Sequence, residues 1–198
     1  MTENLLPTLP TITSDTLSRL RARLAVEAQR EGLLDVAYRT LDSPIGALLL
    51  AATERGLVRV AFAIEGHEVV LAALADEISP RVLAAPARLD APAREIEEYF
   101  TGRRRTFELP LDLRLTSGFR REVITRLPDI GYGRTASYAE VAAAAGSPRA
   151  VRAVGTACAR NPLPIVLPCH RVVRSDGSAG GYRGGPAAKH TLLTLEAG

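Results

Sequence analysis

The spacing of hydrophobic residues predicts a chain that mixes helices and strands. After Ser14-Asp15, a plausible helix cap, apolar residues recur every three or four positions and predict a helix that ends near Gly32. These residues are Leu17, Leu20, Leu24 and Ala28. Three strand-like runs follow at 35–42, 46–53 and 56–64, separated by short turn sequences, and this arrangement predicts an antiparallel meander.

Further elements complete an N-terminal α/β unit. The pattern predicts helices at 67–78 and at Pro92–Phe100, and the segment 107–115 is either a strand or an extended linker. Residues 1–12 contain two prolines and are expected to form a loose arm. The predicted organisation is therefore an arm with an extra helix at 1–34, followed by an α/β domain at 35–115.

The second half, 116–198, is predicted to be mostly helical. One helix begins at Ser117 and stops at Pro128, and a second runs over Ser137–Ala145 with Ser137 as its cap. The turn Gly146-Ser147-Pro148 separates it from a helix at Arg149–Arg160, which is the sequence outline of a helix-turn-helix. An apolar strand-to-turn segment at 164–173, a Gly-rich loop at 175–185 and a helix at Pro186–Glu196 complete the predicted α+β fold.

The charge is unevenly distributed along the chain. Of 198 residues, 46% are hydrophobic and 24% charged, which is ordinary for a globular protein. Residues 117–198 carry 11 basic and 5 acidic side chains, a balance of +6, whereas the whole chain has only +3. A basic C-terminal half favours a polyanionic partner such as DNA. The alternative is a bias in base composition, since 24 of the 25 basic residues are Arg.

The helix at 149–160 is the candidate DNA-recognition helix. Arginines for phosphate contact or insertion alternate there with small residues that allow the backbone to approach DNA closely. The candidate contacts are Arg149, Ala150, Val151, Arg152, Ala153 and Gly155. An ordinary Ala-rich packing helix with solvated arginines is the alternative interpretation.

No apolar run approaches the roughly 20 residues of a membrane helix, and the N-terminus lacks the pattern of a secretory signal. We therefore expect a cytoplasmic protein without membrane contact. The cysteines, Cys158 and Cys169, have no CxxC spacing and the three histidines are scattered, so neither a metal nor another cofactor is expected.

Cys169 has the neighbours of a reactive thiol, whereas Cys158 fits a buried structural role. Pro168 suits the start of a helical turn, which would place the thiol near unpaired amides. His170 is a candidate base, acting through water because adjacent residues on a helical turn do not face each other. Glu196 is a candidate to orient the histidine.

The segment NPLPIVLPCHRVV, followed by GGYRGG and LLTLE, resembles the O6-alkylguanine-DNA alkyltransferases, also called methylated-DNA–protein-cysteine methyltransferases. The resemblance is strong from about 116 to 196. Upstream it rests on DSPIG, EYFTG and LPLDL, and it implies a ribonuclease H-like fold for 35–115. The segment 1–34 lies outside it, and a packing or oligomerising helix is the modest expectation there.

The resemblance implies a role for each matching residue. Cys169 would accept the alkyl group, with His170 as base and Glu196 orienting it. Asn161 would organise the turn, Tyr138 would assist the leaving base, and Arg152 would fill the gap in the duplex. The base pocket would be lined by Tyr182, Arg183, Val172, Pro164 and Cys158.

The implied reaction is stoichiometric repair of O6-alkylguanine, and of O4-alkylthymine, in double-stranded DNA by base flipping, with irreversible self-inactivation. No cofactor is implied, and contacts between copies clustering on DNA stay open. Two other interpretations compete: a cysteine hydrolase, and a non-enzymatic helix-turn-helix regulator in which Cys169 is incidental.

Overall fold

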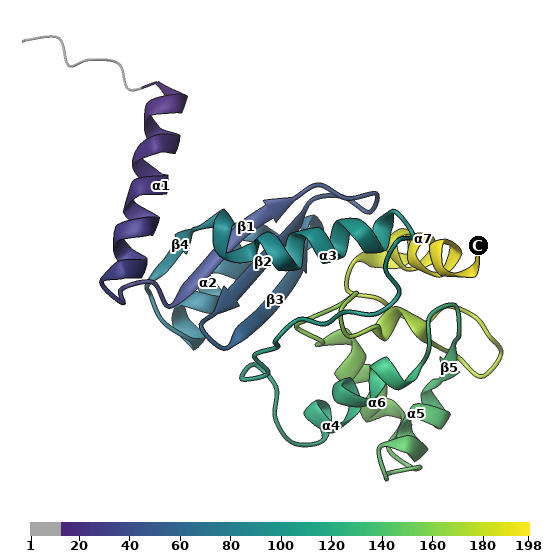
Figure 1. The fold of residues 1–198 in the computed structure, drawn as a ribbon. Helices are drawn as coiled ribbons and strands as arrows, with labels where there is room; N and C mark the ends of the chain where they lie inside the picture. The colour runs from purple at the N-terminus through teal and green to yellow at the C-terminus, as the bar shows by residue number, and fades with distance from the viewer. Residues whose placement is uncertain (1–12) are drawn as a thin grey trace, which may run out of the picture.

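The computed structural model describes residues 13–198, so the predicted arm at 1–12 lies outside the described residues (Figure 1). Within that range, four strands form one mixed sheet in the order β3-β2-β1-β4. The strands β1 (Val36–Leu41), β2 (Leu48–Thr53) and β3 (Gly56–Phe62) form the predicted antiparallel meander. The added strand β4 (Val82–Ala84) runs parallel to β1. Its three residues are too few to show a period, and the sheet is consequently mixed rather than wholly antiparallel.

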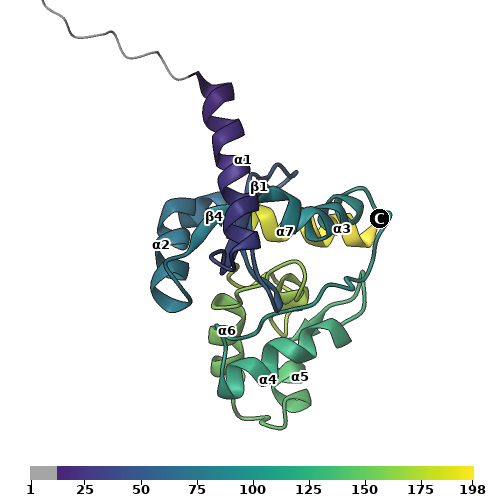
Figure 2. The same ribbon diagram turned by 60° about the vertical axis from the view of Figure 1, so that its left-hand side comes forward.

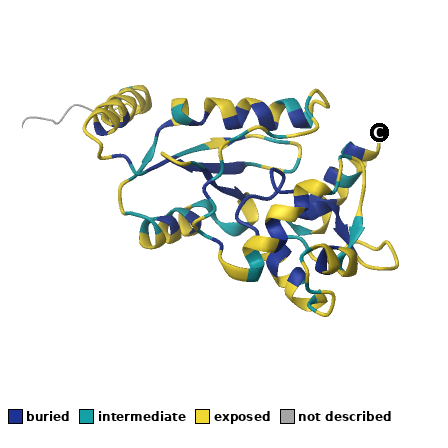
Figure 3. Ribbon diagram, turned by 60° about the horizontal axis from the view of Figure 1, so that its bottom comes forward, coloured by how far each residue is buried: buried dark blue, intermediate teal, exposed yellow. Residues whose placement is uncertain are grey.

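Helices cover both faces of this sheet. Leu49 and Ala51 pack in one buried cluster with α2 (His67–Glu77). Leu48 and Leu50 belong to a larger cluster that includes α3 (Asp90–Phe100) and continues into the C-terminal half. All six residues of β2 are therefore buried, as the dark central strand in Figure 3 shows. A strand that is covered on both faces needs a continuous apolar run rather than an alternating one.

The C-terminal half is built on the predicted helix pair. The helices α4 (Gly118–Arg126), α5 (Tyr138–Ala144) and α6 (Val151–Ala159) bury Val123, Val141 and Val154 against one another. Ser137 caps α5, as predicted, in a reciprocal capping box with Glu140. The recognition helix begins two residues later than predicted because the turn at 147–150 precedes it.

The segment 164–173 is not the predicted strand-to-turn segment over most of its length. Residues 161–168 form buried irregular chain that leads into a 3₁₀ turn, η4 (Cys169–Arg171), and then the short strand β6 (Val172–Val173). This strand pairs in parallel with β5 (Ala136–Ser137), immediately before α5. The pairing brings the start of α5 beside the cysteine turn.

The last helix, α7 (Gly185–Ala197), lies beside α3 in Figures 1 and 2. At the other end of the chain, α1 (Ser14–Arg30) projects from the edge of the sheet near β4. Its cap is Thr13 rather than the predicted Ser14, since the Thr13 hydroxyl accepts a hydrogen bond from the Thr16 amide at 3.2 Å. Leu17, Leu20 and Leu24 of this helix are 40–55% exposed. Among residues 13–198, no helix has the length and apolar character needed to cross a membrane.

The remaining elements are short connections. Three 3₁₀ turns join the longer elements: η1 (Ala63–Glu65), η2 (Pro86–Leu89) and η3 (Leu127–Asp129). The segment 107–115 is extended chain that crosses the start of β3, where the Leu57 amide donates to the Pro110 carbonyl and the Asp112 amide donates to the Leu57 carbonyl. This crossing fixes the last segment of the N-terminal half against the start of β3 at Gly56.

We predict that Gly56→Ala lowers the free energy of unfolding by about 3 kcal/mol or more. Gly56 has φ +133°, and an added Cβ would collide with the Pro110 backbone, which cannot give way as a flexible side chain does. Urea unfolding measures the effect. Gly102→Ala is the control, because Gly102 also has a positive φ but faces open space, and it should cost only about 1 kcal/mol. Equal losses in both variants would show that the close approach at Gly56 is unimportant.

Candidate active site

Cys169 lies at the first position of the η4 turn, and Pro168, which was predicted to begin the turn, is instead the residue that precedes it. The turn is fixed by Asn161, whose Nδ2 donates to the Leu167 carbonyl at 2.7 Å and whose Oδ1 accepts from the Leu163 amide at 3.0 Å. Both Asn161 and Cys169 are buried. Burial raises the pKa of the Cys169 thiol to about 11, although a hydrogen bond from the Asn161 side chain and the nearby Lys189 charge oppose the rise. The thiol is therefore protonated at neutral pH unless a base removes its proton.

Glu196 of α7 is the centre of the polar network behind this turn. Its Oε1 accepts hydrogen bonds from His170 Nε2 at 2.8 Å, from the Tyr99 hydroxyl at 2.7 Å and from Arg171 Nη2 at 2.9 Å. Its Oε2 accepts from Arg171 Nε at 2.8 Å and from the Gly133 amide at 3.2 Å. Burial alone would raise the pKa of Glu196, but hydrogen bonds from His170 and Arg171 outweigh it and hold the pKa at about 2.

The ionised Glu196 fixes the tautomer of His170. A carboxylate only accepts hydrogen bonds, so the proton of a neutral His170 sits on Nε2 and Nδ1 keeps a free lone pair. Within residues 13–198, that Nδ1 is buried and has no hydrogen-bond partner. Burial lowers the pKa of His170 more than Glu196 raises it. The ring is therefore neutral at pH 7, and Nδ1 is the atom available to take a proton.

Lys189 is a functional candidate that the sequence reasoning missed. It is fully buried on α7, and its Nζ donates to the Val172 carbonyl at 2.6 Å. Burial lowers the pKa of Lys189, and the two cysteines near it act in the opposite direction. The available signal was compositional, because Lys189 is the only lysine in a chain that otherwise uses arginine. Tyr99 and Arg171, which bind Glu196, were also missed.

Tyr138 is at the first position of α5 and is half-buried. Burial raises its pKa, and the nearby Cys158 and Cys169 sulfurs raise it further, which places the phenol close to both cysteines. A Cβ on Gly155 would approach the Tyr138 ring at 4.0 Å, so the recognition helix borders Tyr138 at Gly155. Cys158 is buried on α6 and its pKa is raised by burial, which agrees with an inert thiol.

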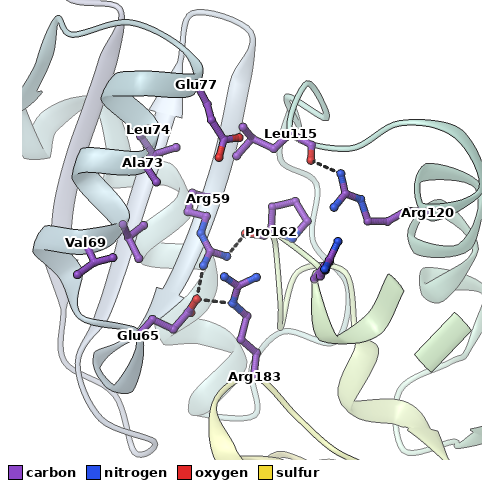
Figure 4. Close-up of a pocket in the computed structure, with 12 residues that line it drawn as sticks. Arg59, Glu65, Val69, Ala73, Leu74, Glu77, Leu115, Arg120, Pro162 and Arg183 are labelled. Carbon is purple, nitrogen blue, oxygen red and sulfur yellow. Dashed lines mark hydrogen bonds and ion pairs between the residues drawn. The ribbon is translucent and has the colours of Figure 1, made fainter. Parts of the chain in front are cut away.

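The Gly-rich loop closes the site on the other side. The Tyr182 hydroxyl is buried without a hydrogen-bond partner among the described residues, and burial raises its pKa well above the usual value, with the nearby Cys169 contributing. The Tyr182 and His170 ring centroids are 6.4 Å apart. Val172 and Pro164, also predicted for the pocket, are buried in the cysteine segment. The Arg183 side chain instead extends to Glu65 beyond the sheet (Figure 4).

The outer face of α6 is open to solvent. The side chains predicted to meet DNA are exposed there, apart from the half-buried Ala150 and Gly155. The exposed ones are Arg149, Val151, Arg152 and Ala153. Cys158 of the same helix is buried, together with Val154 and Ala157. The helix thus separates an exposed cationic surface from a buried thiol. Residues 13–198 contain no group of three His, Cys, Asp or Glu side chains that could hold a metal ion.

A helix-turn-helix beside a buried cysteine, histidine and glutamate defines a class of DNA-binding protein with a candidate nucleophile. The comparisons identify the family. A model of the 6-O-methylguanine DNA methyltransferase DNA-binding domain matches residues 118–198, and one of its ribonuclease-like domain matches 36–113. The chain belongs to this family, which confirms the resemblance seen in the sequence.

Individual relatives agree. The methylated-DNA–protein-cysteine methyltransferase of Methanosarcina barkeri is 41% identical over 159 residues, which are 80% of this chain and 96% of the relative. The crystal structure of Mycobacterium tuberculosis O6-methylguanine methyltransferase has a TM-score of 0.72 and 37% identity, covering 82% of this chain and 93% of that one. A complex of the M. tuberculosis protein with DNA has a TM-score of 0.71 and 36% identity, with coverage of 81% and 92%. The family matches begin at residue 36, so α1 lies outside them.

We predict that Glu196→Gln lowers the free energy of unfolding at pH 7 by about 3 kcal/mol, because it leaves the Arg171 guanidinium buried without its counter-charge. Because folding lowers the pKa of Glu196, its ionised carboxylate stabilises the folded state at pH values above the usual carboxyl pKa of 4.5. This stabilisation is lost as the pH falls from 4.5 towards about 2. The difference between wild type and variant should therefore shrink across that range. Urea unfolding at several pH values measures it.

The matched control is Glu27→Gln, which removes an exposed ion pair with Arg30 on α1. It should change the stability by less than about 0.5 kcal/mol at every pH. A Glu196→Gln protein as stable as this control at pH 7 would contradict the central place of Glu196.

Proposed function

We propose that this protein repairs DNA by transferring the alkyl group of O6-alkylguanine, and of O4-alkylthymine, to the Cys169 sulfur once per molecule. The observation that carries the proposal is the buried group of Cys169, His170 and Glu196 in the same domain as a recognition helix with exposed arginines. Neither part suffices alone: the helix explains how DNA is reached, and the buried group explains what happens to the lesion.

The thiol needs help to react, since its pKa is about 11. We infer that His170 Nδ1 takes the Cys169 proton through a bridging water, and that Glu196 holds the ring and stabilises the imidazolium that forms. The sulfur–carbon bond then forms while the carbon–oxygen bond to the base breaks. The electron pair of the broken bond goes to the base oxygen. The thioether product has no route to hydrolysis, so each molecule reacts once.

The leaving base is assisted from two sides. We infer that the Tyr138 hydroxyl donates to the base as charge develops on it. The Arg183 backbone amide, beside Tyr182, would face the lesion oxygen, and Val172, Pro164 and Cys158 would complete the pocket. Asn161 keeps the cysteine turn in place. Lys189, held by the Val172 carbonyl, adds a positive charge that favours the thiolate.

The recognition helix delivers the lesion. The target carbon is inaccessible in a stacked duplex, so the nucleotide must be flipped out at a cost of a few kcal/mol. Arg152 on the exposed face of α6 would occupy the vacancy, while Arg149 and the small residues Ala150, Val151, Ala153 and Gly155 would allow close approach to the minor groove. Contacts between copies on the same DNA are compatible with this arrangement.

We also propose the division of the chain into an N-terminal extension at 1–34, an α/β domain at 35–115 and a DNA-binding alkyltransferase domain at 116–198. The proposed location is the cytoplasm, which suits the two free cysteines.

We predict that incubation with duplex DNA containing O6-methylguanine adds one methyl group, in place of one hydrogen, to the Cys169 peptide, with no turnover. Intact-protein and peptide mass spectrometry measure the gain. Cys169→Ala should bind the DNA without any gain, and Cys158→Ala is the matched control that should still be methylated.

The other interpretations give different results in the same assay. A cysteine hydrolase would turn over a thioester substrate without retaining a methyl group. A helix-turn-helix regulator would bind DNA with no mass change. Either outcome in the wild-type protein contradicts the repair function.

We predict a flat dependence of the alkyl-transfer rate on pH from about 7 to 9, measured with free O6-benzylguanine. Between the lowered pKa of His170 and the raised pKa of Cys169, the neutral imidazole and the thiol both predominate. At acidic pH, below the usual imidazole pKa, the rate should fall as His170 becomes protonated. The charged groups that act on this pair are Glu196, Arg171, Lys189 and Arg183.

His170→Gln removes the base and serves as the comparison. Its rate should rise about tenfold per pH unit between 7 and 9, because only the ionised fraction of the thiol reacts. A wild-type rate that climbs equally steeply would exclude His170 as the base.

A further inference from the structure

Glu65 connects the loop over the cysteine to the opposite half of the molecule. It ends η1, just after β3, and its carboxylate is almost completely buried. Its Oε2 accepts from Arg59 Nη2 of β3 and from Arg183 Nε of the Gly-rich loop, and its Oε1 accepts from the Phe62 amide at 2.9 Å. Figure 4 shows both arginines directed at this carboxylate. We refer to Arg59, Glu65 and Arg183 as the loop clamp.

The clamp is anchored rigidly on the sheet side. Arg59 is only 5% exposed, and its Nη1 also donates to the Val60 carbonyl at 3.0 Å and to the Pro162 carbonyl at 3.2 Å. Burial lowers the pKa of Arg59, and the Glu65 charge offsets part of the effect. Pro162 belongs to the buried segment that leads to Cys169. The same guanidinium therefore contacts the cysteine segment and fixes the carboxylate that binds the loop.

The loop is held at two further points beside the clamp. The Phe62 and Tyr182 rings meet edge to face with centroids 5.4 Å apart. A Cβ on Gly184 would approach the Phe62 ring at 2.8 Å, so the loop backbone lies directly against this ring. Tyr182, Arg183 and Gly184 thus all rest on the end of β3, and Tyr182 places its hydroxyl in the buried site next to Cys169.

Within its own half, the loop is held by a backbone bridge between Val173 and Ala179 and by Gly180, which lies against the Tyr138 ring, but by no ion pair among the described residues. Its internal backbone bonds are short-range ones, such as the Gly185 amide to the Tyr182 carbonyl at 3.0 Å and the Gly177 amide to the Arg174 carbonyl at 2.9 Å. Consecutive glycines carry a large conformational entropy, so such a chain samples many positions unless its side chains are tied. The Arg183 guanidinium supplies a planar, permanently charged group for that purpose. Arg183 also borders a cavity of about 690 Å³ between α2 and the C-terminal half, so its guanidinium has open space on one side (Figure 4).

We propose that Glu65 is a positioning residue for alkyl transfer, which fixes the pocket loop over Cys169 by binding Arg183 and Arg59 together. The inference rests on the proposed function. A loop held in advance pays less ordering cost when the flipped base enters. The binding of the base is therefore tuned from the N-terminal half, which contributes no group to the reacting atoms.

The test uses Arg183→Gln in the full chain and free O6-benzylguanine as the probe. This variant leaves the buried Arg59–Glu65 pair intact, whereas Glu65→Gln also removes the partner of a buried arginine and serves as a second variant. We expect the half-saturating probe concentration to rise about tenfold in Arg183→Gln, because the loop forms the pocket wall, and the limiting rate to fall by a smaller factor, because the substitution keeps both the Arg183 amide and the base His170. Hydrogen exchange of the peptide covering 180–185 should be faster.

The matched control is Arg81→Gln, which loses the same charge and a two-bond ion pair with Asp35 far from the loop. It should leave both kinetic parameters and loop exchange unchanged. Arg152→Ala should show the opposite selectivity, slowing repair of duplex DNA far more than reaction with the free base. Combining Glu65→Gln with Arg183→Gln should produce no further rise beyond the larger single effect, since the two residues act through one bond.

A half-saturating concentration in Arg183→Gln within twofold of wild type would overturn the proposal, as would an equal change in Arg81→Gln. So would a variant that loses its limiting rate while its half-saturating concentration stays constant. Failure of the proposed function is distinguishable, because the wild-type protein itself would then gain no benzyl group on Cys169.

Discussion

The carboxylate of Glu196 is the interaction on which the site depends. It brings together the ends of the chain's main elements, since Tyr99 comes from α3, His170 and Arg171 from η4, Gly133 from the segment before β5, and Glu196 itself from α7. A buried carboxylate is costly unless it is fully paired, and here five hydrogen bonds satisfy it. The cost of burying this charge is thus offset only when all of these elements are in place. The hydrogen bonds that prepare His170 therefore form only when the two halves of the chain are packed together.

The same network explains how a thiol with a raised pKa can be a nucleophile. A permanently ionised cysteine would be open to oxidation, whereas Cys169 is buried and protonated until its neighbours accept the proton. Glu196 holds the proton of His170 on Nε2, which leaves the lone pair of Nδ1 free to accept a proton. The reactivity of Cys169 then depends on the position of its neighbours and not on a permanently ionised thiol. This suits a protein that can use its cysteine only once.

Local sequence was sufficient to predict most helices and strands and the candidate nucleophile, but not the long-range contacts that join them. The meander, the capped α5 and the Cys169–His170 pair all follow from short-range spacing and turn residues. The missed strand β4 has three residues and is stabilised by pairing with β1, 46 positions away along the chain. The apolar run before Cys169 resembled a strand, yet it forms no ladder: the Asn161 and Arg59 side chains and a single amide of β3, that of Val60, bond the backbone of this buried segment. Tyr99, Arg171 and Lys189 were hidden because partners far along the chain define their roles.

The sequence locates Arg183 in the Gly-rich loop but does not reveal the contact that its side chain makes. Its position in the loop follows from the GGYRGG motif, which directs attention to its backbone amide. Its side chain turns instead to Glu65, 118 positions earlier in the chain, and no local pattern encodes that contact. The side chain of this residue therefore binds the end of β3, whereas the proposed function uses only its backbone amide. A loop of glycines can only present an amide accurately if something outside the loop holds it, and in this protein the opposite half of the molecule supplies that support.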